Sequence, residues 1–362
     1  MSGAAGGSGA PGILFRCDGS PSIGMGHVVR CSALALALKK RGCPVAVVMR
    51  DLPGNAGDLV RRAGVPVEMI AYPSSAQETS LAEQDLDRTV EAAERRRAGF
   101  VVVDHYGASS CYLGKMKTRG IRVAVIDDLA DRDLAPADWL LNQNLGAAGL
   151  PYRARPDCVR LLGPSYALLR PEFGVLRAHL SRKFEPEDRR VLLTLGGGVE
   201  TAEFGPKILD ALSRMDRSLE VRCVLLGDST PASLTQAAAV SRHQVEILRS
   251  VGNMAEQMAW ADLSINGGGS TCWELCCLGV PMVILTLAPD QEPTAVELER
   301  RGCALSMGKW RPDVDTGRLV GLVESLLADT GKREAMSRTA RALVDGTGAE
   351  RAAVSLMALV GR

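Results

Sequence analysis

Short apolar runs alternate with segments of helical periodicity along most of the chain. In the first half, runs typical of buried strands occupy residues 13–18, 44–50, 65–70, 100–106 and 121–128. Helical patterns lie between them, for example from Val28 to Arg41 and from Leu81 to Ala98. Because these runs are apolar at nearly every position, both faces of their sheet should be covered. The first half therefore predicts a doubly wound parallel α/β sheet.

The pattern becomes irregular between residues 129 and 187 and then resumes. The second set of expected strands covers residues 189–198, 220–228, 244–250, 261–267 and 280–287. A chain of 362 residues also exceeds the usual size of a single core. We therefore expect two doubly wound, Rossmann-like domains at 13–176 and 188–362, preceded by a flexible tail at 1–12. Ligands of such folds bind beyond the carboxyl ends of the strands, and we expect the site in the cleft between the domains.

Net charge, apolar runs and cysteine spacing limit which kinds of binding partner we expect. A net charge of +1 gives no electrostatic reason to expect a nucleic acid or an anionic membrane. No apolar run approaches the roughly 20 residues that span a bilayer, and the first residues lack the pattern of a signal peptide. The ten cysteines match no zinc spacing. We expect a cytoplasmic protein with reduced thiols and no membrane insertion, while protein partners stay unknown.

Three glycine-rich loops follow expected strands and precede expected helices: "SIGMGH" (22–27), "LGGGVE" (195–200) and "INGGGSTCWE" (265–274). Glycine lets backbone amides approach a ligand, and a helix N-terminus offers unpaired N–H groups, so such loops suit phosphates. For any one of these loops, the alternative explanation of its glycines is that a tight turn between strand and helix requires them for steric reasons. Their spacing matches neither the dinucleotide fingerprint nor the P-loop.

The third loop is the richest in chemistry. We assign Gly268, Gly269, Ser270 and Thr271 to binding of a diphosphate. Glu274 lies about one turn into the expected helix, where its carboxylate would bridge two vicinal hydroxyls of a ribose. The alternative is that Ser270 and Glu274 only cap the helix.

His27 lies where the first glycine loop meets a helix, in a chain with four histidines. Gly24 and Gly26 are expected to clear space there for a sugar phosphate. The positive end of the helix dipole disfavours a second positive charge, so a neutral imidazole suited to general-base catalysis is expected. A packed or capping histidine is the alternative.

At this point the chain resembles a known family through five segments in order: "RCDGSPSIGMGHVVRCSALA", "VVVDHYG", "VIDDLADRDLAPADWLLNQNLG", "LLGPSYALLRPEF" and "GGGSTCWELCCLGVPMVILTLAPDQ". They resemble the UDP-2,4-diacetamido-2,4,6-trideoxy-β-L-altropyranose hydrolases of pseudaminic acid biosynthesis and their spore-coat-polysaccharide relatives. The resemblance covers about residues 13–305. It implies a two-domain glycosyltransferase-B fold, a UDP-sugar in the cleft, and hydrolysis of the anomeric C–O bond with inversion, without metal or cofactor.

Carried over position by position, the family's general base falls on His27 and a tyrosine near the sugar on Tyr106, and we assign both to catalysis. The further substrate-binding positions are Arg170, Gly197, Met254, Glu274, Asp290 and Gln291. Asp290 stands where the family usually has asparagine, and "GGGVETAEF" (196–204) departs from the family's "GGSD". A glycosyltransferase with the same fold and UDP site, and a nucleotide-sugar-binding subunit without turnover, are therefore the alternatives.

Several other polar groups have two interpretations. Asp131-Arg132-Asp133 matches the D-x-D metal motif of a different transferase fold, but its polar surroundings favour a solvated loop. For Asp127 and Asp128, at a strand end, a structural role and a sugar contact are both open. His105 lies beside Tyr106 at the end of an expected strand, and the sequence leaves open which face of the sheet its side chain points to.

Overall fold

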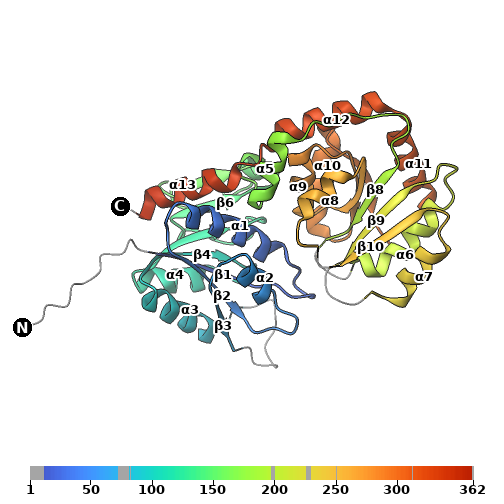
Figure 1. The fold of residues 1–362 in the computed structure, drawn as a ribbon. Helices are drawn as coiled ribbons and strands as arrows, with labels where there is room; N and C mark the ends of the chain where they lie inside the picture. The colour runs from blue at the N-terminus through green and yellow to red at the C-terminus, as the bar shows by residue number, and fades with distance from the viewer. Residues whose placement is uncertain are drawn as a thin grey trace, which may run out of the picture.

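The computed structural model describes residues 12–71, 81, 83–196, 200–225, 230–249, 251–311 and 313–360. Its strands form two parallel sheets, each covered by helices (Figure 1). The first sheet has the order β3 (Val67–Ile70), β2 (Val45–Arg50), β1 (Gly12–Cys17), β4 (Ala98–Asp104), β5 (Arg122–Ile126), β6 (Trp139–Asn142) and β7 (Val159–Leu162).

Alternation along the strands of this sheet builds a core on each face. Phe15 of β1 packs with α1 (Gly26–Lys40), whereas the neighbouring Leu14 packs with α3 (Glu83–Arg95) and α4 (Ser110–Thr118). The short helix α2 (Gly57–Arg62) connects β2 to β3. Since both faces are buried, the near-continuous apolar character of the strands is explained.

The second sheet has the order β10 (Gln244–Arg249), β9 (Glu220–Leu225), β8 (Arg190–Thr194), β11 (Leu263–Gly267), β12 (Met282–Thr286) and β13 (Leu305–Lys309). One face packs against α6 (Glu200–Leu212), α7 (Ala232–Val240) and α11 (Thr316–Ala328). The other packs against α5 (Pro171–His179), α8 (Met254–Trp260), α9 (Thr271–Leu278), α10 (Glu292–Arg300) and α12 (Thr330–Leu343).

The strand order confirms the predicted doubly wound architecture. In the first sheet the chain turns back between β1 and β4, and in the second between β8 and β11. At such a switch point two neighbouring loops diverge beyond the carboxyl ends of their strands and leave room for a ligand. The "SIGMGH" loop follows β1, and the "INGGGS" loop follows β11, so each domain offers one of these glycine loops at its switch point.

Each of the ten expected strands has a counterpart, and the sheets contain three further strands, β6, β7 and β13. Two of them, β6 and β7, lie in the part of the chain expected to be irregular. They are only four residues long. A run of that length carries too few alternating positions to be distinguished from a loop.

The last helix, α13 (Gly348–Val360), lies against α1 of the first sheet (Figure 1). Ala352, Ala353 and Leu356 are fully buried in the core that α1 and the first sheet share. The range 188–362 expected for the second domain includes this helix, but its apolar face completes the first. The chain therefore crosses between the domains twice, through α5 and between α12 and α13.

The last turn of α5 and the connection after it are held to the second domain by arginines. Arg177 donates to the carbonyl of Cys277 at 2.6 Å, and Arg182 donates to those of Ala261 at 2.7 Å and Leu278 at 2.9 Å. These carbonyls lie at helix C-termini, where cations are favourable.

Within the described ranges, no helix has both the length and the apolar character needed to cross a membrane.

Candidate active site

The loop that carries His27 is shaped by a glycine turn. Gly24 has a φ of +85°, a conformation that favours glycine, and its N–H donates to the carbonyl of Ser20 at 2.8 Å. The helix begins at Gly26, so His27 occupies its first turn. The imidazole is thereby held at the carboxyl end of β1, and 12% of its side chain is exposed.

Asp104 at the end of β4 holds the imidazole of His27. The Asp104 Oδ1 lies 2.7 Å from His27 Nδ1. Arg30, one turn after His27, donates to both oxygens of Asp104 at 2.6 Å. Burial by itself would raise the pKa of Asp104, but Arg30 and His27 lower it well below its ordinary value. Because an ionised carboxylate only accepts, Nδ1 carries the proton, and Nε2 of a neutral ring is left as the acceptor.

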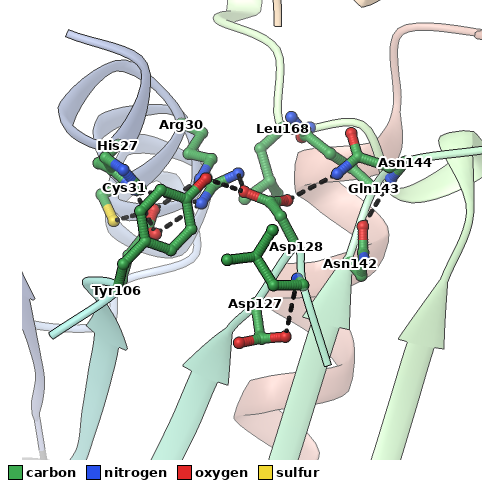
Figure 2. A network of polar contacts seen from close by, with 12 residues as sticks. His27, Arg30, Cys31, Tyr106, Asp127, Asp128, Asn142, Gln143, Asn144 and Leu168 are labelled. Carbon is green, nitrogen blue, oxygen red and sulfur yellow. Dashed lines mark hydrogen bonds and ion pairs between the residues drawn. The ribbon is translucent and has the colours of Figure 1, made fainter. Parts of the chain in front are cut away.

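Tyr106 extends over His27 from just beyond β4 (Figure 2). The two rings meet edge to face, with centroids 4.9 Å apart and planes at 82°. The Tyr106 hydroxyl donates to Asp128 at 3.1 Å, and Asp128 also accepts from Arg30 and Asn144, both at 2.7 Å. Burial raises the pKa of Tyr106, and Asp128 raises it further, so the phenol keeps its proton. Tyr106 can orient a ligand or the imidazole, but it is not a base.

Asp127 has a structural role in this protein. Its carboxylate accepts from the amides of Leu129 at 3.1 Å and Ala130 at 2.7 Å and from Arg132 at 2.7 Å. It therefore fixes the polar loop that contains the D-x-D sequence. In the part of the chain that the structure describes, no three His, Cys, Asp or Glu side chains are grouped as a metal site.

The third glycine loop is tightly packed at its base and open at its tip. A Cβ at Gly267 would lie 2.6 Å from the Leu195 carbonyl, and one at Gly268 would lie 2.9 Å from the Gln291 carbonyl. Gln291 also fixes the loop through its side chain, which accepts from the Gly268 amide at 3.0 Å. A Cβ at Gly269 would meet nothing within 4 Å. Gln291 therefore stabilises the conformation of this loop.

The capping alternative for Ser270 and Glu274 does not match the structure. Ser270 precedes α9 and makes no side-chain capping bond, and Thr271 is the first residue of the helix. Glu274 instead accepts from Arg170 at 3.0 Å. Burial raises the pKa of Glu274, although Arg170 opposes this effect. The two predicted substrate residues thus form an ion pair between the start of α5 and α9.

The two glycine loops approach each other between the domains. A Cβ built on Gly26 would lie 3.8 Å from the Ser270 Oγ of the second domain. His27 follows Gly26 directly, so the predicted base and the predicted diphosphate loop belong to different domains but lie near each other where the two domains meet.

The remaining predicted positions are less closely joined to this cluster. Asp290 is exposed beside Gln291, and Met254 is half-buried against the core of the second domain. Gly197 lies outside the described residues. Their substrate contacts stay predictions.

Two residues that contact His27, Asp104 and Arg30, were not singled out from the sequence. Asp104 shares a strand face with Phe100 and Val102, which pack under α1, so alternation along "FVVVD" could have placed it there. Arg30 is three residues after His27, the spacing of neighbours on a helix face.

Comparison with known proteins supports the fold and a relation to nucleotide-sugar enzymes. Residues 191–352 match the model of the "Glycosyltransferase family 28 C-terminal domain". The chain is 24% identical over 334 residues to the "Spore coat polysaccharide biosynthesis protein SpsG" of Bacillus subtilis, covering 91% of this chain and 93% of that protein. It is also 24% identical over 297 residues to the "UDP-2,4-diacetamido-2,4,6-trideoxy-beta-L-altropyranose hydrolase" of Campylobacter jejuni, covering 80% of this chain and 97% of that protein.

Among solved structures, the MurG protein of Acinetobacter baumannii superposes with a TM-score of 0.67 at 17% identity, covering 96% of this chain and 99% of that one. The chain has the glycosyltransferase-B fold. Its relatives include enzymes that act on nucleotide sugars. In a glycosyltransferase-B fold with His27 on one domain and the "INGGGS" loop on the other, the cluster described above is the candidate active site.

Proposed function

We propose that the protein hydrolyses a UDP-sugar, with His27 as the general base that activates water. The observation that carries this proposal is the hydrogen bond of 2.7 Å between Asp104 and His27 Nδ1. It leaves Nε2 as the acceptor, and the glycine loop of the other domain lies beside the same turn. The relative from Campylobacter jejuni, which is named for hydrolysis of a UDP-diacetamido-trideoxy sugar, indicates the substrate class.

The proposed step needs one base and one site for the leaving group. A water oxygen attacks the anomeric carbon while the bond from that carbon to the UDP oxygen breaks, and the water proton passes to His27 Nε2. UDP leaves with the electron pair of the broken bond, and the sugar is released with inverted configuration. The Asp104 carboxylate stabilises the imidazolium that forms. We assign the amides of Gly269 and Ser270 to stabilising charge on the departing diphosphate, since they precede the N-terminus of α9.

The surroundings of His27 favour a small nucleophile. Its side chain is 12% exposed, with Tyr106 packed edge-on against the ring. A water molecule needs less access than a hydroxyl group carried on a large acceptor. The same enclosure strengthens the interaction of His27 with Asp104 because it excludes bulk water.

A glycosyltransferase is the second candidate, and the match of residues 191–352 to a glycosyltransferase domain favours it. The base would then deprotonate an acceptor hydroxyl in place of water. A panel of UDP-sugars, incubated with the protein with and without added acceptors and EDTA, separates the two by the release of UDP. Hydrolysis predicts release without an acceptor and in the presence of EDTA. Release only with an acceptor would replace the proposal by transfer, and loss of release in EDTA would contradict a metal-independent step.

Variants at the base test the residue assignment. We expect His27→Gln and Asp104→Asn each to lower kcat by about 100-fold or more, since one removes the base and the other changes the tautomer that its partner holds. The dissociation constant for UDP, measured by calorimetry, should change less than about twofold because UDP is assigned to the second domain. His179→Gln, at an exposed histidine, is the matched control. Wild-type turnover in His27→Gln would remove this residue from the chemistry.

A further inference from the structure

A second polar cluster lies on the opposite face of the first sheet from His27. We call it the buried charge cluster, and it consists of Arg16, Asp18, Arg50, Asp85, His105 and Tyr112. All six side chains are less than 9% exposed. They come from the carboxyl ends of β1, β2 and β4 and from α3 and α4. The proposed chemistry assigns no role to this cluster.

Asp18 is the centre of the cluster. It follows β1, at the start of the loop that leads to His27, and its carboxylate accepts from the Arg50 amide at 2.7 Å and the Arg50 Nε at 2.8 Å. Arg16 donates to it at 3.0 Å. Burial opposes ionisation, but Arg16, His105 and Arg50 hold the pKa of Asp18 well below its ordinary value.

His105 joins Asp18 to the end of β4. Its Nδ1 accepts from the Gly107 amide at 2.9 Å, so the ring proton is on Nε2. Nε2 lies 3.3 Å from Asp18 Oδ2 and 3.0 Å from Arg50 Nη2. With its proton on Nε2, the ring donates to Asp18, because a guanidinium group accepts no hydrogen bond. Burial lowers the pKa of His105, which keeps the ring neutral in this arrangement. One imidazole therefore bridges the loop after β1 and the turn after β4.

The neighbours of His105 in sequence, Asp104 and Tyr106, both contact His27. Asp104 points to the α1 side of the sheet, His105 to the α3 side, and Tyr106 returns over the His27 ring. A shift in this turn would displace Asp104 and Tyr106 from His27 together. Burying several ions costs desolvation energy that apolar packing would avoid, so such a cluster is better explained by positional specificity than by stability.

We propose that His105, through its hydrogen bond to Asp18, is a positioning residue that keeps Asp104 and Tyr106 in register with His27. The expected effect of His105 on kcat rests on the proposed function, but its expected effect on the position of Asp104 against His27 does not. The Asp18 link can be separated from the Gly107 link by substitution. The amide nitrogen of glutamine in His105→Gln can reach the place of Nε2, whereas the amide of asparagine in His105→Asn matches Nδ1 only.

The experiment compares His105→Gln, His105→Asn and His105→Ala with the wild type. The first readout is the NMR signal of the His27 Nδ1 proton in protein with ¹⁵N-labelled histidine rings, assigned by its absence in His27→Gln. We expect the signal to persist in His105→Gln and to be lost or shifted in His105→Asn and His105→Ala. The second readout is kinetic: kcat should fall by about 10- to 100-fold in His105→Asn, with KM and UDP affinity within about twofold. The kcat of His105→Gln should stay within about threefold of the wild type.

Tyr112→Phe is the control for a purely structural effect. It removes the hydroxyl that donates to Asp85 at 2.8 Å, in the same cluster but away from β4. It should lower the thermal midpoint without altering kcat or the His27 signal. An unchanged His27 signal in His105→Asn would overturn the proposal, as would a glutamine variant no better than the asparagine variant. A protein that releases no UDP would refute the proposed function alone, because the NMR comparison still decides the role of His105.

Discussion

Asp104 decides what His27 can do. The sequence explained a neutral imidazole by the helix dipole alone, whereas the structure adds a carboxylate that fixes the position of the ring proton. Arg30 holds that carboxylate with two charge-assisted hydrogen bonds, which are among the stronger kinds in proteins. The direction of one nitrogen lone pair therefore depends on two side chains from different elements.

The charge state of Asp104 has a consequence for stability in acid. Despite burial, its pKa is lower in the folded protein than in the unfolded chain, so its contribution is present near neutral pH and lost as pH falls. We expect Asp104→Asn to have a lower thermal midpoint than the wild type at pH 7, and the difference to shrink as pH falls below about 4. Asp58→Asn, at a side chain 82% exposed, should show no such trend. A difference that is constant with pH would contradict this account of Asp104.

At the scale of elements, the neighbouring glycines of the "INGGGS" loop differ in why the fold has glycine at each position. Gly267 and Gly268 are required because backbone carbonyls approach them, whereas Gly269 faces open space. Gln291 holds the loop from the start of α10. A sequence pattern of three glycines therefore combines steric needs of the fold with one position that is free for a ligand.

Alanine substitutions at Gly268 and Gly269 should distinguish a glycine required by close packing from a glycine that leaves room for a ligand. Gly268→Ala would place a Cβ 2.9 Å from the Gln291 carbonyl, so we expect a loss of about 1–3 kcal/mol in stability and a lower thermal midpoint. Gly269→Ala should keep the wild-type midpoint while weakening UDP binding, because its new methyl group points into the proposed diphosphate site. Thermal unfolding and calorimetry with UDP measure both effects. A lower midpoint in Gly269→Ala would show that this position is packed and not open.

At the scale of the whole molecule, the chain returns to its first domain at the end. Helix α13 buries small and apolar residues against α1, and Arg122 of β5 donates to the Leu359 carbonyl. The helix that carries His27 is therefore covered by the last residues of the chain. The stability of the domain that carries His27 therefore depends on a segment that sequence order assigns to the second domain.

Two substitutions in α13 test this dependence. Leu356 is fully buried and Val354 is 48% exposed, on the same helix. Leu356→Ala should cost about 2–5 kcal/mol, and Val354→Ala about 0.5 kcal/mol or less. Hydrogen exchange should show faster exchange in α1 for Leu356→Ala only. Faster exchange confined to the second sheet would contradict the placement of α13.

The sequence by itself determined the two-sheet architecture and the position of its glycine loops. Apolar runs fix a buried parallel strand by local composition, and turns between strands and helices expose the loops at one edge of the sheet. His27 could be singled out for the same local reason, since it lies where such a loop meets a helix, whereas Tyr106 is assigned through the family resemblance.

The tertiary structure alone decided which side chains meet. Asp104 is 77 residues from His27 in sequence, Glu274 is 104 residues from Arg170, and α13 packs on a helix near the start of the chain. Contacts of this kind depend on strand order and on helix packing, which periodicity does not encode. Periodicity reports which face of an element is apolar, whereas the partner of a polar group is set by where the fold brings the chain back.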